Sequence, residues 1–237
     1  MGWEGLGLLL AACFASTMAG AQEAAAPLTV IFSSVEIGPS AYVNAGFKRA
    51  LGVSLYEEGF LVMGNVGGGR RREKVAQPWG LSRVDHLSAE ASLLAGYQWK
   101  TERAVVAVFA GPELQHKQPV VDGAILEAER SSIGGRLMAE VWAHPTENTL
   151  ATGTLLVGTA PQRIWTRAQF GWRILDGVYA GPEAVFSAEE SYRETRFGLH
   201  VTGLTFGAYT FNLSGGVLVA DDDRPGGYVG LTMHFNL

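Results

Sequence analysis

The sequence predicts an all-β fold: an antiparallel up-and-down transmembrane β-barrel of about 12 strands. Three observations predict this fold class. Apolar and polar residues alternate strictly at the end of the chain, in 228–237. Charged residues make up 17% of the chain, below the roughly 25% of soluble domains. The two longest connections between the predicted strands leave the same end of the barrel, which is typical of outer-membrane barrels.

The last predicted strand has one apolar face and one polar face. A period of two places alternate side chains on opposite sides of a strand. Bacterial outer-membrane barrels in general end on such a strand, with an aromatic side chain last. Here the last residue is Leu237 and the aromatic one is Phe235. The apolar residues of this strand are Val229, Leu231, Met233, Phe235 and Leu237.

The middle of the chain has no stretch that predicts a membrane-spanning helix. Such a helix needs roughly 18 to 20 apolar residues in a row, and no segment after the N-terminal one reaches that length. A chain that crosses lipid as strands must close into a barrel, because an open sheet edge leaves backbone groups unpaired. The sequence therefore predicts a closed sheet.

The first residues predict a secretory signal peptide at 1–21. An apolar core at 6–14 is followed by Ala19-Gly20-Ala21, a small-x-small cleavage site. Glu4 precedes that core without any Lys or Arg, so either the true start differs or the signal is unusual. Cys13, the single cysteine, closes a segment that also fits a bacterial lipoprotein box, and its lipidation stays open. A linker at 22–27 then leads to the barrel at 28–237.

The strands follow one another without a helical pattern between them. Each predicted strand is near the roughly 9 to 11 residues that a tilted strand needs to cross a bilayer. Their even number is that of bacterial single-chain barrels. The aromatics of 97, 142, 165, 172, 179, 192 and 209 lie mostly near strand ends, as interfacial girdles do. The predicted strands are 28–37, 41–50, 58–68, 87–98, 103–115, 133–143, 148–158, 163–173, 177–188, 192–202, 206–219 and 227–237.

The connections predict which end of the barrel faces outward. If both termini are periplasmic, the odd-numbered connections lie outside, and the two long ones, 69–86 and 116–132, are among them. Short periplasmic turns and long outer loops are typical of outer-membrane barrels.

A charged face on neighbouring strands predicts a polar barrel interior. In 163–173 the charged and polar residues fall on one face and the apolar residues on the other, and the next two strands repeat the pattern. Arginines and carboxylates of adjacent strands can then pair across the sheet. This interior polar network is the candidate ligand-binding site, and its predicted members are Arg167, Arg173, Glu113, Glu183, Arg196 and Glu194.

An aromatic-Ala-Gly-Pro-Glu motif occurs twice, at 109–113 and 179–183. Proline cannot donate to a strand ladder and usually marks a bulge or a sheet edge. The repeat therefore predicts two matching bulges, each of which turns a glutamate inward.

Six short motifs are spread along nearly the whole predicted mature chain. They are Ser33–Tyr42, Glu58–Leu61, Leu94–Gln98, Gly111–Glu113, Gly181–Glu183 and Ser214–Gly216. Together these motifs resemble the bacterial cellulose biosynthesis protein BcsS family. The resemblance implies an outer-membrane role in making or exporting cellulose, with cellulose or the cellulose synthase machinery as partner and the outer-membrane lipid as surroundings. It implies no catalytic residues.

Two other functions stay open, and two kinds of site are not expected. An outer-membrane lipid hydrolase would use Ser187, Glu189 and His200, and Glu113 with Glu183 could serve as a glycosidase pair. A small-solute pore is the other possibility. No cofactor or metal site is expected, because no cysteine follows Cys13 and no two histidines are close. A net charge of −5 gives no basic face for nucleic acid.

Overall fold

The computed structural model describes residues 26–52, 54–77, 80–121, 124–125, 130–160, 162–189, 192–221 and 225–237. Within strands, the side chains of 72–77, 80–84, 119–121 and 124–125 lie outside this description. The predicted signal peptide, with Cys13, also lies outside it. In the described part of the chain, no helix is both long enough and apolar enough to cross a membrane.

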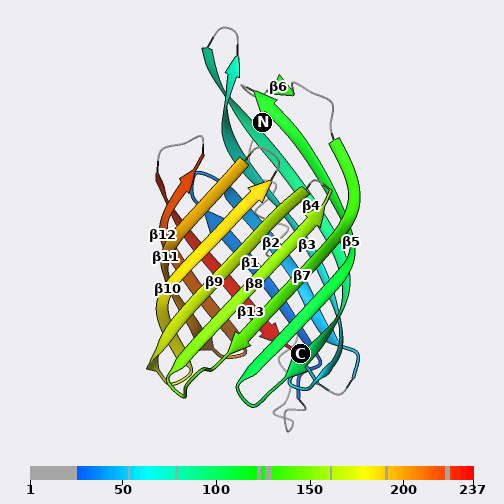
Figure 1. The fold of residues 1–237 in the computed structure, drawn as a ribbon, viewed down its shortest axis with the longest axis vertical. Helices are drawn as coiled ribbons and strands as arrows, with labels where there is room; N and C mark the ends of the chain where they lie inside the picture. The colour runs from blue at the N-terminus through cyan, green and yellow to red at the C-terminus, as the bar shows by residue number, and fades with distance from the viewer. Residues whose placement is uncertain are drawn as a thin grey trace.

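Twelve long strands form one closed antiparallel sheet, and a two-residue strand, β6, is added beside β5 (Figure 1). Consecutive long strands pair with each other, β13 pairs with β1, and β4 pairs with β5, so the described barrel strands have no open seam. The prediction of a barrel with about 12 strands is confirmed. The strands are β1 (Thr29–Ile37), β2 (Ala41–Ala50), β3 (Gly59–Gln77), β4 (Gly80–Lys100), β5 (Ala104–Val121), β6 (Ala124–Ile125), β7 (Arg130–Ala143), β8 (Thr149–Thr159), β9 (Gln162–Leu175), β10 (Val178–Glu189), β11 (Tyr192–Phe206), β12 (Tyr209–Ala220) and β13 (Gly226–Asn236).

The alternating C-terminal segment closes the barrel. β13 lies between β12 and β1, and its pairing with β1 runs from Val30 opposite Asn236 to Ile37 opposite Val229. Beyond the ladder, the backbone N–H groups of Leu28 and Thr29 both donate to the carbonyl of Leu237. The apolar residues of β13 face outward and the polar ones face inward, as the period of two requires.

The two barrel ends differ. We call the end with the C-terminus the terminal end, and the opposite end, where the β3–β4 hairpin stands above the other strands, the hairpin end (Figure 1). The prediction of long loops at 69–86 and 116–132 is largely wrong. β3 and β4 stay paired from Arg70 opposite Leu87 to Gln77 opposite Gly80, and β5 continues to Val121. The sequence pattern failed here because a strand that has left the lipid needs no apolar face.

The predicted bulges at the two prolines are also wrong. The register of β5 and β10 with their neighbours is unshifted at Pro112 and Pro182, and the irregularity in β10 falls between Val178 and Tyr179. The glycine before each proline explains the motif better. A Cβ on Gly111 would lie 2.9 Å from the Cα of Leu94, and the neighbouring backbone is equally close at Gly181. These positions therefore require a residue without a side chain.

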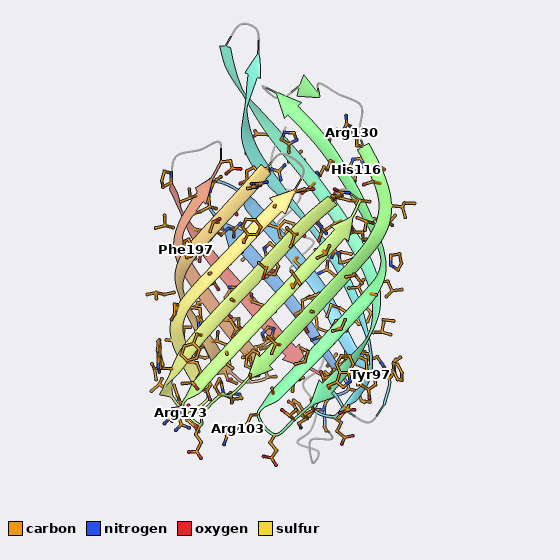
Figure 2. The ribbon with its side chains drawn as sticks, viewed as in Figure 1. Tyr97, Arg103, His116, Arg130, Arg173 and Phe197 are labelled. Atoms are coloured by element: carbon orange, nitrogen blue, oxygen red, sulfur yellow. The ribbon has the colours of Figure 1, made fainter. Side chains whose placement is uncertain are left out.

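The outer surface is apolar and carries an aromatic belt at the terminal end. Large apolar side chains are exposed all around the barrel, and Phe197 lies on its outer flank (Figure 2). Ring pairs in the belt include Phe60–Tyr97 at 5.0 Å, Phe170–Trp172 at 5.0 Å and Tyr209–Phe235 at 5.2 Å between centroids. An apolar surface of this extent fits lipid, and the belt fits its interface with water. Of the predicted girdle, Trp142, Trp165, Tyr179 and Tyr192 instead lie on the inner face of the barrel.

Candidate functional site

The barrel interior at the terminal end is apolar, and the connection from β2 to β3 packs against it. Buried side chains of β2 to β5 form a cluster there, with Leu55 of the 51–58 turn packed against it. Gln98 holds this turn in place, since its Nε2 donates to the carbonyl oxygens of Leu55 at 2.9 Å and Glu57 at 2.8 Å. This turn therefore narrows the opening of the barrel at the terminal end. The buried members of the cluster are Ala50, Leu61, Met63, Leu94, Ala107 and Phe109.

A square of two arginines and two glutamates lies further toward the hairpin end. Arg136 Nε donates to Glu113 Oε2 at 2.9 Å, and Arg136 Nη2 lies 3.2 Å from a carboxylate oxygen of Glu90. Arg163 reaches the same two carboxylates from β9, with its Nη2 3.2 Å from Glu113 Oε2. Glu113 is 1% exposed and Arg136 is 3% exposed. Burial of these charges is tolerable because each has opposite charges in contact.

A second group surrounds Glu183 on β10. Arg167 Nε donates to Glu183 Oε2 at 2.7 Å, and Gln169 donates to the same oxygen at 2.5 Å. The hydroxyl of Tyr228, three strands away on β13, donates to the other oxygen at 2.9 Å. Tyr228 reaches across Gly198, where an added Cβ would lie 2.6 Å from its hydroxyl oxygen. Glu183 is thus held by neighbours from β9 and β13.

A third group surrounds Arg196 on β11. Its Nε donates to Glu194 Oε1 at 2.5 Å, and its Nη1 pairs with Glu36 of β1. The hydroxyl of Tyr192 donates to the other oxygen of Glu194 at 2.5 Å. The guanidinium of Arg196 also lies 5.4 Å from the ring centroid of Tyr228, which connects this group to the second one.

Three further ion pairs cross the lumen, two of them through Glu189. Near the hairpin end, Glu189 of β10 contacts Arg71 of β3 at 3.2 Å and Lys117 of β5 at 2.5 Å. β3 and β10 lie six strands apart in a ring of twelve long strands, so Arg71 and Glu189 bridge opposite walls. Near the terminal end, Lys48 of β2 pairs with Glu140 of β7, and its Nζ lies 5.5 Å from the ring centroid of Phe109.

Strand β5 contributes one side chain to each of three groups in the interior: the ion pairs near the hairpin end, the square and the apolar cluster. Lys117, Glu113 and Phe109 point inward at intervals of four residues, which is about 13 Å along a strand. Lys117 belongs to the bridge near the hairpin end, Glu113 to the square, and Phe109 to the apolar cluster. Side chains therefore cross the lumen at several heights.

Five of the six predicted site residues take part in these groups. Glu113, Glu183, Arg167, Glu194 and Arg196 lie in the lumen with the partners given above. Arg173 lies apart: it is exposed at the terminal end, where its Nη2 donates to Asn148 Oδ1 at 2.5 Å (Figure 2).

Sequence reasoning did not name several members of the network. Arg136 and Glu140 alternate with apolar residues on β7, a signal that was available in the sequence. Partners from distant strands give no such signal, because a barrel brings them together only when it closes. The members not named in advance are Glu36, Lys48, Arg71, Glu90, Lys117, Arg136 and Glu140.

The geometry does not assemble a hydrolase triad from Ser187, Glu189 and His200. In the β10–β11 register, Ser187 lies opposite Glu194, whereas His200 lies opposite Gly181, six residues or about 20 Å further along. His200 is 2% exposed, and its Nδ1 lies 2.9 Å from the hydroxyl of Thr202. Nucleophile and base need to be within hydrogen-bond reach.

The proposed glycosidase pair is likewise occupied. Glu113 and Glu183 contact different arginines of β9, Arg163 and Arg167, which are four residues apart. Glu183 is held by Arg167, and Glu113 is held by Arg163 and Arg136.

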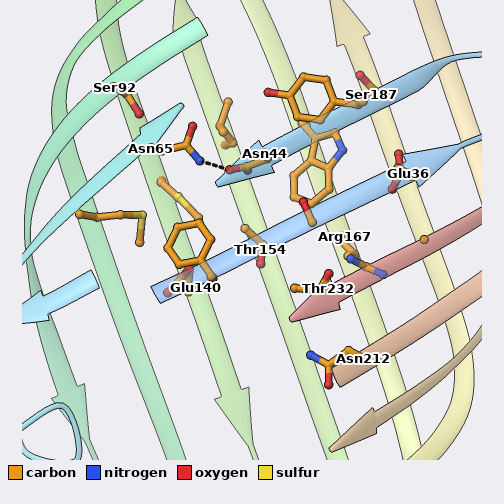
Figure 3. A pocket seen from close by; sticks show the side chains of 18 of the residues that line it. Glu36, Asn44, Asn65, Ser92, Glu140, Thr154, Arg167, Ser187, Asn212 and Thr232 are labelled. Carbon is orange, nitrogen blue, oxygen red and sulfur yellow. Dashed lines mark hydrogen bonds between the residues drawn. The ribbon is translucent and has the colours of Figure 1, made fainter. Parts of the chain in front are cut away.

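A cavity of about 730 Å³ remains between these groups inside the barrel. Figure 3 shows Glu36, Arg167, Asn212 and Thr232 around it, on strands from different parts of the chain. Among the described residues, no group of three His, Cys, Asp or Glu side chains is placed to hold a metal ion.

Solved structures with this fold are outer-membrane barrels. The chain is similar to the KdgM porin, with 10% identity and a TM-score of 0.53 over 88% of this chain and 99% of that one. It is also similar to the KdgM porin in complex with disordered oligogalacturonate, with 11% identity and a TM-score of 0.52 over the same shares. The β domain of the Bordetella autotransporter BrkA gives 13% identity and a TM-score of 0.52 over 90% of this chain and 99% of that one. These likenesses confirm the fold.

The family of the chain is shown by comparison of its sequence. No curated protein matches the chain in sequence. A family model described as cellulose biosynthesis protein BcsS matches residues 30–237, which is the whole barrel apart from its first residue. With its closed sheet and apolar outer face, the chain is an outer-membrane barrel with a role tied to cellulose biosynthesis. It belongs to the BcsS family of cellulose biosynthesis proteins.

Proposed function

We propose that this protein is a non-catalytic accessory barrel of the outer membrane, which supports the production or secretion of cellulose together with the cellulose synthase machinery. The family match supports the connection to cellulose. The observation that carries the accessory role is the interior itself, because ion pairs join walls up to six strands apart and occupy much of the lumen. A polymer strand would have to break these pairs to pass.

The placement of the candidate catalytic side chains supports a non-enzymatic role. Among the described residues, Ser187 is far from His200 and the buried glutamates are engaged by arginines. The wall residues are thus arranged to hold one another, which fits a structural role of the interior.

A small-solute pore is the second candidate, and the cavity of about 730 Å³ is the observation that favours it. The KdgM porin, which has this fold, was solved with oligogalacturonate. We place this candidate second because Glu189 joins both Arg71 and Lys117 across the lumen near the hairpin end.

The proposed function is tested by removing the gene in the bacterium that encodes this chain. We expect the amount of extracellular cellulose to fall several-fold and to return when the wild-type gene is restored. The Ser187→Ala variant is expected to restore cellulose equally well, since its hydroxyl has no catalytic task in this account. Cellulose is measured as glucose released by cellulase from washed cells. An unchanged amount of cellulose in the deletion strain, or a failure of Ser187→Ala to restore it, would contradict the proposal.

A further inference from the structure

The cavity between the luminal ion pairs is lined by uncharged polar and apolar side chains as well as by members of those pairs. Amide and hydroxyl side chains from β1, β2, β3, β8, β9, β12 and β13 line it, and Figure 3 shows part of this set, with Asn44 and Asn65 joined by a hydrogen bond. A volume of about 730 Å³ lies within the range of ligand pockets in proteins. The uncharged polar residues of the lining include Ser34, Asn44, Asn65, Thr152, Thr154, Gln169, Asn212 and Thr232.

The charges of the luminal ion pairs cancel one another. The luminal ion pairs described above use seven basic and seven acidic side chains, so they leave no net charge to attract an ion. Charged side chains that line the cavity are thus paired with one another, so a charged ligand would have to compete with these pairs, whereas a neutral ligand would not. The basic members are Lys48, Arg71, Lys117, Arg136, Arg163, Arg167 and Arg196, and the acidic ones are Glu36, Glu90, Glu113, Glu140, Glu183, Glu189 and Glu194.

Part of the hydrogen-bonding capacity of the wall is unused. Asn65 Nδ2 donates to Asn44 Oδ1 at 2.7 Å, but the buried Asn65 Oδ1 accepts no hydrogen bond from the described residues. A buried acceptor without a partner costs free energy, which a ligand hydroxyl would recover. Thr154 and Thr232 also line the cavity and add hydroxyl groups to its wall.

Two tryptophans border the same cavity. Trp165 lies on the inner face of β9 between Arg163 and Arg167, and Trp142 lies on β7 toward the terminal end. Trp142 pairs with Thr152, which pairs with Gln169, so the two indoles are offset by four residues or about 13 Å along β9. The negative face of an indole attracts the C–H groups of a sugar ring. Amides for hydroxyls and indoles for ring faces are therefore present together.

We propose that the cavity in the barrel is a binding site for a short neutral oligosaccharide of β-linked glucose, with Trp165 as its stacking platform and Asn44, Asn65 and Asn212 as hydrogen-bonding partners. A β-linked glucan has flat C–H faces and a rim of hydroxyls and carries no charge, which matches the wall. This inference rests on the proposed function, because the choice of glucose among neutral sugars comes from the connection to cellulose.

Calorimetric titration of the full-length mature protein in detergent tests the proposal. We expect saturable binding of cellotetraose and none of oligogalacturonate, a chain of similar size that carries carboxylates. Trp165→Leu is expected to weaken cellotetraose binding at least tenfold. Trp172→Leu is the matched control, because Trp172 lies on the same strand but on the lipid face, and it is expected to bind like the wild type. Asn65→Leu, which keeps the side-chain volume, is expected to weaken binding several-fold.

Three results would overturn the inference: no saturable cellotetraose binding by the wild type, equal binding by Trp165→Leu and the wild type, or oligogalacturonate binding as tight as that of cellotetraose. Folding of each variant is checked by the heat-dependent gel shift of the barrel, and if Trp165→Leu does not fold, Asn65→Leu decides. The failure of this inference is distinguishable from that of the proposed function. A barrel that binds no cellotetraose, but whose deletion still lowers cellulose, refutes the binding site alone.

Discussion

Replacing Glu113 with leucine is expected to destabilise the barrel by about 3–5 kcal/mol, the cost of breaking a buried ion pair by removing one partner. Two buried arginines, Arg136 and Arg163, would then share the single carboxylate of Glu90. The measurement is the free energy of unfolding in denaturant, followed by tryptophan fluorescence in lipid vesicles.

The double variant with Arg136→Met supplies the control. It removes one charge of each sign and leaves the pair between Arg163 and Glu90 intact, so we expect it to be less destabilised than the sum of the two single variants. Strict additivity would mean that the two side chains do not interact, and the description of the square would then be wrong.

Placing arginine at Leu199 is expected to cost roughly 2–4 kcal/mol, the cost of a basic side chain on the lipid face at the middle of the bilayer. Leu199 is the central residue of β11, points outward and is 68% exposed. The readout is again the free energy of unfolding in vesicles, compared with that of the wild type.

Phe206→Arg is the matched control for position. Phe206 also points outward from β11 and is 67% exposed, but it ends the strand within the aromatic belt, where arginine costs roughly 0–1 kcal/mol. Because exposure is the same at both positions, only depth in the lipid distinguishes them. Equal costs would show that the apolar face of β11 does not lie in lipid.

The strands were predictable because lipid and lumen impose a strict alternation. The segment 163–173, in which all three arginines fall on one face, is a clear case, and β9 has the predicted faces. Alternation also placed Glu183, Glu194, Arg167 and Arg196 inside, and the repeated aromatic-Ala-Gly-Pro-Glu motif predicted the same for Glu113. Arg173 keeps the predicted alternation on β9, but it is exposed instead of luminal, because the strand leaves the lumen at the terminal end.

The partners across the lumen were not predictable from periodicity. Glu90 and Arg163 are 73 residues apart and meet only because β4 and β9 face each other once the sheet closes. The strand extension at 70–77 was missed for a related reason. In this extension β3 and β4 are held together by backbone pairing. Backbone pairing needs no alternation of apolar residues, so the sequence pattern does not predict it. Trp165 was predicted to be an interfacial aromatic, although it shares one face of β9 with Arg163 and Arg167 and therefore lies inside.

Electrical recording of the purified barrel in planar lipid bilayers tests the central claim most directly, namely that side chains crossing the lumen keep this barrel from being an open conduit. We expect insertion without the steady, ohmic current steps of a porin, because Arg71, Lys117 and Glu189 join opposite walls near the hairpin end and Lys48 pairs with Glu140 near the terminal end. Stable open steps of porin size from the wild-type protein would contradict this account.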